Sequence, residues 1–124
     1  MDAADRAKVD SEFAKLKLAD ATRHVFLCVG PKCCSTEAGL ATWEVLKRRL
    51  KEKQLTAMRT KADCLRICVG GPWMVVYPEG VWYGAVTPER CERIVTEHLE
   101  GCQAIAEWIV RQHELGGARP PGAL

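Results

Sequence analysis

The sequence lacks the features that mark membrane and secreted proteins. No apolar run approaches the roughly 20 residues that a membrane-spanning helix needs. The start of the chain, Met1 to Arg6, has neither the basic end nor the apolar centre of a signal peptide. The net charge of +2 is too small to indicate nucleic-acid binding. We therefore expect a cytoplasmic protein with no membrane and no nucleic-acid partner.

Two familiar cysteine motifs are missing as well. There is no Cys-x-x-Cys, which argues against dithiol exchange of the thioredoxin type. The plant-type ferredoxin spacing, Cys-x4-Cys-x2-Cys with a distant fourth cysteine, is also absent. The chain nevertheless has seven cysteines in 124 residues. In a reducing compartment such a number favours metal binding or redox work over disulfides.

The pattern of apolar residues predicts one α/β domain. A buried strand is expected at 24–29, a helix capped by Ser35 or Thr36 follows it, and a second strand is expected at 55–60. Runs at 73–77 and 81–86 predict an antiparallel hairpin. A helix beginning at Thr87 and a last helix over 102–115 complete the order. The expected fold is a mixed sheet of about four strands, of which the first two are parallel. Helices flank the sheet, and a C-terminal helical extension follows it.

The chain divides into three parts on this basis. Residues 1–22 are expected to form an N-terminal helical extension, because apolar side chains recur there at helical spacing. Residues 23–115 form the domain. Residues 116–124, rich in proline and glycine, are expected to be a disordered tail.

Four cysteines follow the first two strands in pairs. Cys28 and Cys33 have four residues between them, and Cys64 and Cys68 have three. Ligands commonly gather where the strands of an α/β sheet end. Four thiolates suit either a [2Fe–2S] cluster or a structural zinc, so the spacing alone leaves both open. Because a whole helix and strand separate the pairs within a self-sufficient domain, we favour a redox centre.

The chain carries a resemblance to a known family, and its second half holds the more specific part. The residues concerned are Cys28-x4-Cys33, Cys64-x3-Cys68, Gly71-Pro72 and Val75-Val76-Tyr77-Pro78-Glu79-Gly80-Val81-Trp82-Tyr83. Over residues 23–115 the sequence resembles the thioredoxin-like [2Fe–2S] ferredoxins, to which the small cluster-bearing subunits of bacterial NADH dehydrogenases and NAD-linked hydrogenases are related. The resemblance implies a thioredoxin-like fold, often a homodimer, and one-electron transport without catalysis. It places the cluster ligands on Cys28, Cys33, Cys64 and Cys68, with Cys34 as the alternative to Cys33.

Several functional interpretations stay open at this stage. The leading one is a one-electron carrier that docks transiently with redox donors and acceptors. A cluster-bearing subunit of a larger NAD-linked dehydrogenase or hydrogenase is the alternative. A zinc-stabilised interaction module and a redox sensor that uses Cys34 are less favoured.

Other residues carry secondary expectations. The turn Gly70-Gly71-Pro72 is expected to shape the cluster pocket and to donate backbone N–H groups to its sulfurs. Cys91 and Cys102 are expected to pack in the core, and His24 to be structural rather than a ligand. Trp73, Trp82 and Tyr83 could screen the cluster, form part of a dimer face or pack in the core. Cations near the cysteine pairs predict a basic collar; they are Arg23, Lys32, Arg59, Lys61 and Arg66.

Overall fold

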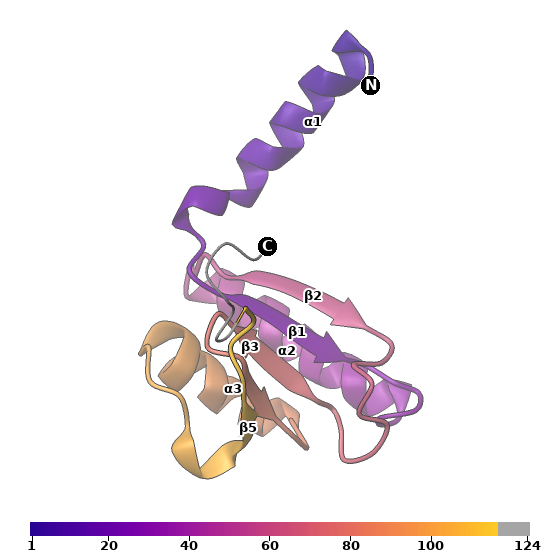
Figure 1. Cartoon of the computed structure of the whole chain (residues 1–124), viewed down its shortest axis with the longest axis vertical. Helices are drawn as coiled ribbons and strands as arrows, with labels where there is room; N and C mark the ends of the chain where they lie inside the picture. Colours follow the sequence, from indigo (N-terminus) through magenta and orange to yellow (C-terminus); the bar gives the residue numbers. More distant parts are fainter. Residues whose placement is uncertain (117–124) are drawn as a thin grey trace.

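The computed structural model of the chain describes residues 1–116, so the expected tail lies outside the described residues except for Gly116. Five strands form a single mixed sheet in the order β2-β1-β3-β4-β5 (Figure 1). They are β1 (His24–Cys28), β2 (Met58–Ala62), β3 (Met74–Tyr77), β4 (Val81–Tyr83) and β5 (Ile109–Gln112). β1 and β2 are parallel, and every other pair is antiparallel. The predicted mixed α/β sheet with one parallel pair is confirmed.

Helix α2 (Thr36–Glu52) covers one face of the sheet. Ser35 caps it, because the Ser35 side chain accepts the N–H of Ala38 at 3.1 Å. Its stripe of Trp43, Leu46 and Leu50 is buried against the sheet, as its helical spacing predicts.

The second packing helix is α3 (Pro88–Ile94), which continues into the wider turn η2 (Val95–Glu100). Thr87 caps α3 through a bond from the N–H of Arg90, and Cys91 and Ile94 are fully buried. Both helices contribute to one core cluster with side chains of the sheet, among them Val25, Leu27 and Val76. The opposite face carries half-buried aromatic side chains, namely Phe26, Tyr77 and Trp82.

The predicted last helix over 102–115 is wrong. Gly101 ends η2, and Cys102 adopts a left-handed backbone with φ of 58°. The chain then forms a short turn, η3 (Ala106–Trp108), and strand β5. The edge of β4 accepts residues 109–112 as an antiparallel partner, and the hydroxyl of Tyr83 accepts the N–H of Ile105 at 3.1 Å. These contacts with distant residues override a local pattern that was compatible with a helix.

Helix α1 (Ala3–Leu16) extends away from the rest of the molecule (Figure 1). Asp2 caps it by accepting the N–H of Asp5 at 2.8 Å, and none of its residues is buried. A short turn, η1 (Leu18–Asp20), links it to β1. The division into an extension at 1–22 and a domain at 23–115 stays a prediction. Within the described residues, no helix is long and apolar enough to cross a membrane.

Candidate metal centre

Cys28 stands at the end of β1, where two loops meet. Its side chain is fully buried, and its Sγ accepts the backbone N–H of Trp73 at 3.1 Å. Gly30 turns the chain away from the sheet with φ of 86°, and an added Cβ would lie only 2.3 Å from the carbonyl oxygen of Cys34. The first cysteine loop is therefore folded tightly back on itself.

Cys64 and Cys68 stand opposite, in the loop that follows β2. Their sulfurs are 3.7 Å apart. Two thiolates on one tetrahedral metal, with metal–sulfur bonds of about 2.3 Å, would be separated by about 3.8 Å. Cys64 Sγ also accepts the N–H of Arg66 at 3.1 Å, which the left-handed backbone of Arg66 (φ 77°) allows. This pair is therefore spaced as two ligands of the same metal ion.

Gly71 joins the two loops. Its N–H donates to the carbonyl oxygen of Cys33 at 2.9 Å. A Cβ at Gly71 would lie 2.8 Å from that oxygen and 3.0 Å from the Cβ of Cys33, so only glycine fits without movement. The contact of Gly71 with Cys33 gives the expected role of this turn in shaping the pocket a geometric basis. Its predicted N–H donation to sulfur is wrong for Gly71, because that N–H bonds a carbonyl group.

The environments of the thiols differ from one loop to the other. Cys28 and Cys33 are buried, Cys64 is partly exposed and Cys68 is exposed. Burial, helped by the neighbouring Cys33 thiol, raises the pKa of Cys28 to about 12. The pKa of Cys68 is raised by its contact with Cys64, and Lys32 opposes that rise. The charge of Lys32 therefore offsets only part of the rise in the pKa of Cys68.

The four sulfurs are not arranged around one point. Among residues 1–116, no group of three or more His, Cys, Asp or Glu side chains surrounds a position for a single metal ion. A mononuclear zinc site would need about four ligands around one position, whereas each iron of a [2Fe–2S] cluster takes two cysteines. Two cysteine pairs on facing loops are a donor set that a [2Fe–2S] cluster can use.

Comparison with known proteins agrees with this geometry. No protein-family model matches the chain. The chain is 31% identical over 110 residues to a protein named "Ferredoxin, 2Fe-2S" from Aquifex aeolicus (strain VF5), a match that covers 81% of this chain and 95% of the relative. It is 33% identical over 91 residues to a protein of the same name from Clostridium pasteurianum, covering 66% of this chain and 89% of the relative.

A solved structure of a thioredoxin-like [2Fe-2S] ferredoxin from Aquifex aeolicus superimposes with a TM-score of 0.66. The sequence identity is 29%, and the match covers 84% of this chain and 99% of that chain. This chain belongs to the thioredoxin-like [2Fe–2S] ferredoxins. The family and the thioredoxin-like fold expected from the sequence are both confirmed.

In this ferredoxin, Cys33 and Cys34 have different surroundings. Cys33 is 4% exposed and lies against Gly71 of the second loop. Cys34 Sγ is 3.7 Å from Cys33 Sγ, and Cys34 is partly exposed. Burial, with the Cys33 thiol, raises the pKa of Cys34 to about 11. Cys33 therefore contacts the opposite loop and is the more buried of the two.

The predicted basic collar of the ferredoxin is incomplete. Arg23 precedes β1, at the end away from Cys28, and pairs with Glu79 at 2.9 Å. His24 is at the same end, where its Nε2 lies 2.8 Å from Thr60 Oγ1, and burial lowers its pKa. Arg23 therefore does not belong to the collar, and His24 has a structural partner, as expected.

The expectations for the two remaining cysteines have different outcomes. Cys91 is fully buried in the core, and burial raises its pKa to about 12. Cys102 is exposed, so its predicted packing role is wrong; its helix does not form.

The Trp73 indole donates to the carbonyl of Val69 at 2.7 Å and covers Gly84. Trp73 therefore holds the end of the second cysteine loop, while Tyr83 is buried in the core.

A buried polar chain was not found by sequence reasoning. Tyr83 accepts the N–H of Ile105, so its own proton points to His98 Nδ1, 2.8 Å away. His98 Nε2 then donates to Glu79 at 2.6 Å. The three side chains span 20 positions of sequence, from Glu79 to His98. No local pattern marks them, and the only signal was a histidine, His98, among the apolar residues of the segment that forms η2.

Proposed function

We propose that this ferredoxin is a one-electron carrier holding a single [2Fe–2S] cluster on Cys28, Cys33, Cys64 and Cys68. The family supports the cofactor. The observation that carries the ligand assignment is the contact of the two cysteine loops at Cys33 and Gly71, which brings the pairs to the same site. When bound, the cluster supplies the one-electron chemistry. The chain itself binds, orients and screens it, and we propose no catalysis.

Cys33 is the favoured second ligand because of where it lies. It lies against Cys28 and Gly71 of the second loop and is buried, whereas Cys34 is partly exposed. Two backbone N–H groups, those of Trp73 and Arg66, donate to Cys28 and Cys64 at 3.1 Å. Donors to ligand sulfur stabilise the more negative, reduced state, so both raise the reduction potential.

The exposed side of the site supports transient docking of redox partners. Cys68 is exposed, and Lys32 and Arg66 lie in the two cysteine loops without an ion pair among the described residues. These cations would attract an acidic partner and increase its association rate. The partners we propose are protein donors and acceptors of single electrons, in the cytoplasm.

We also propose that two copies pair as a homodimer. The sheet face opposite α2 and α3 carries Phe26, Tyr77 and Trp82, all half-buried. A nearby hollow of about 330 Å³ is lined by apolar side chains and Arg111; the apolar ones are Ile67, Trp73, Trp82 and Val110. Apolar surface of this kind is what a second copy would cover.

The decisive experiment is to purify the protein anaerobically and record its absorption spectrum, its reduced-state EPR signal, and its iron and acid-labile sulfide. We expect about two irons and two sulfides per chain, and a signal only after reduction. Zinc without sulfide would instead support the interaction module. Co-purification with a flavoprotein at fixed stoichiometry would support the subunit. A cluster that survives oxidant equally well in Cys34→Ser would argue against a sensor.

A further inference from the structure

Strand β2 forms one edge of the sheet in the described chain. Its backbone groups at Met58 and Ala62 face β1, because Met58 N–H donates to Arg23 at 2.9 Å and the Ala62 carbonyl accepts from Val29 at 2.8 Å. Successive residues of a strand direct their N–H and C=O groups to opposite edges. Arg59 and Lys61 therefore present theirs outward, and an open strand edge is a template for another extended chain.

The side chains of the same two residues are cationic and exposed. The guanidinium of Arg59 lies 5.5 Å from the ring centre of Trp43, and the ammonium of Lys61 lies 5.9 Å from it. Neither side chain has an ion pair among residues 1–116. The ring of Trp43 therefore holds the charged ends of Arg59 and Lys61, which have no ion pair, beside the open backbone edge of β2.

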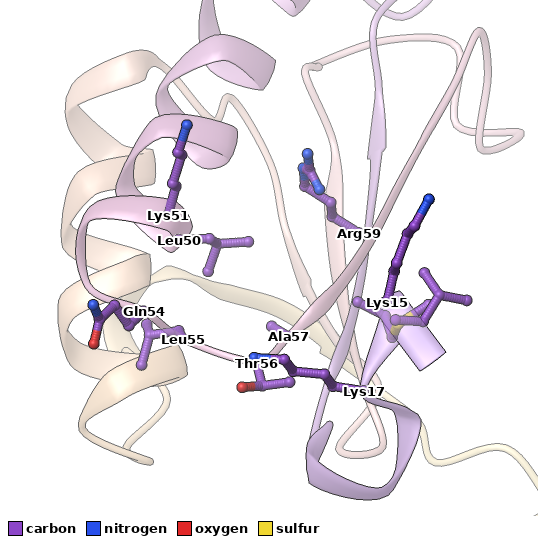
Figure 2. Close-up of a pocket in the computed structure, with 11 residues that line it drawn as sticks. Lys15, Lys17, Leu50, Lys51, Gln54, Leu55, Thr56, Ala57 and Arg59 are labelled. Carbon is purple, nitrogen blue, oxygen red and sulfur yellow. The ribbon is translucent and has the colours of Figure 1, made fainter. Parts of the chain in front are cut away.

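A hollow of about 720 Å³ continues this surface between the ends of α1 and α2. Its lining contains four cations and no acid; the cations are Lys15, Lys17, Lys51 and Arg59. The charged ends of Lys15, Lys51 and Arg59 point the same way around it (Figure 2). Only Lys15 has an ion pair in the described chain, with Glu12 at 3.0 Å. Leu55 and Ala57 supply apolar contact within the hollow.

We propose that the β2 edge and this hollow bind an extended, acidic segment of a partner protein, which adds to the sheet beside β2. Backbone bonds to Arg59 and Lys61 would hold the segment, as in known cases of strand addition. Acids at alternate positions would lie on the face that carries the Arg59 and Lys61 side chains. This inference concerns a protein partner and does not require the cluster.

The charges select this occupant over a second copy of the chain. Two β2 edges placed together would bring Arg59 and Lys61 of both copies into contact, and like charges across neighbouring strands are destabilising. The C-terminal residues 117–124 contain an arginine and no acidic side chain, so they do not complement the hollow either. Outward N–H and C=O groups favour a polypeptide over a nucleic acid.

The test uses the cluster-loaded protein and three fluorescent peptides. The first alternates Glu with Val, the second has Lys in place of Glu, and the third keeps Glu but is N-methylated at alternate residues. The variant is Arg59→Glu/Lys61→Glu. Its matched control, Arg6→Glu/Lys8→Glu, makes the same change of net charge with exposed cations near the start of α1. Binding is measured by fluorescence anisotropy, and the absorption spectrum shows that each protein keeps the same cofactor content.

We expect the Glu peptide to bind the native protein and the control with dissociation constants within about twofold, and the variant at least about tenfold more weakly. N-methylation should weaken binding by about tenfold, because it removes the backbone bonds. Hydrogen exchange over residues 57–62 should slow when the Glu peptide binds. Equal binding to variant and control, equal binding of the N-methylated peptide, or binding only of anionic vesicles or single-stranded DNA would overturn the proposal.

Discussion

Replacing Gly71 with alanine would separate the two cysteine loops. The added methyl group would lie 2.8 Å from the carbonyl oxygen and 3.0 Å from the Cβ of Cys33. The obstacle is main chain, which cannot rotate aside like the end of a flexible side chain. One loop must therefore move by several tenths of an ångström, and the bond from Gly71 N–H to Cys33, now 2.9 Å, weakens or breaks.

The magnitude follows from these two losses. Breaking one buried hydrogen bond costs about 1 kcal/mol, and forcing an extra methyl group into a packed site costs about 1–3 kcal/mol. Together they lower the free energy of unfolding by about 2–4 kcal/mol. With a urea m-value of about 2 kcal/mol/M, the midpoint falls by about 1–2 M. The measurement is urea unfolding followed by circular dichroism, together with iron and sulfide content.

Gly70→Ala is the matched control. Gly70 has φ of 81°, and its nearest neighbour is the Trp73 ring at 3.6 Å, so there is space for the methyl group. The cost is backbone strain of about 1–2 kcal/mol without a displacement of Cys33. We expect Gly70→Ala to keep its iron and Gly71→Ala to lose part of it. Full iron content and an unchanged midpoint in Gly71→Ala would refute the reasoning.

Four further predictions follow from the same structure. Cys34→Ser should keep the absorption spectrum while Cys33→Ser should change it or lose the cluster, and the reverse pattern would assign the ligand to Cys34. Tyr83→Phe removes the hydroxyl that bonds the N–H of Ile105 and the ring of His98. The free energy of unfolding should therefore fall by about 1–3 kcal/mol while the iron content stays unchanged. Tyr77→Phe is the comparison in which neither quantity should change. Burial lowers the folded-state pKa of His24 below the unfolded value of about 6.5. The stability linked to His24 is therefore present above the unfolded pKa and is lost as the pH falls through the folded pKa. Urea midpoints should decrease from pH 7.5 toward 5.5, and they should decrease less steeply in His24→Gln. Trp82→Glu should shift the sedimentation coefficient from that of a dimer to that of a monomer, and an unchanged coefficient would place the interface elsewhere.

Elements with a strong local pattern could be predicted from the sequence. Ser35 and the stripe from Trp43 to Leu50 predicted α2, and the apolar runs predicted the β3–β4 hairpin. β5 could not be predicted, because its partner is the open edge of β4, almost 30 positions earlier. The chain leaves the helical direction at Cys102, which has a left-handed backbone, and residues 105–112 then contact Tyr83 and β4.

For the site, too, features set by residues close in sequence could be predicted, and features set by residues distant in sequence could not. The spacing of the cysteine pairs and the resemblance predicted which loops meet. The two N–H donors to sulfur were not identified, because the donation of Trp73 to Cys28 depends on how β3 leaves the second loop. Arg23 was assigned to the collar because it is close to Cys28 in sequence. An extended strand of five residues separates them, which puts Arg23 at the opposite end beside Glu79.

The bond between Gly71 and Cys33 involves only backbone atoms, so it needs no metal in order to form. Residues 33 and 71 are 38 positions apart, and bringing such distant segments together is the main entropic obstacle to building a site from two loops. In this chain the sheet and the Gly71 contact meet part of that entropic cost through backbone atoms alone. The contact limits how far the two cysteine loops can move apart, so less freedom remains to be lost when ligands from both loops hold one group.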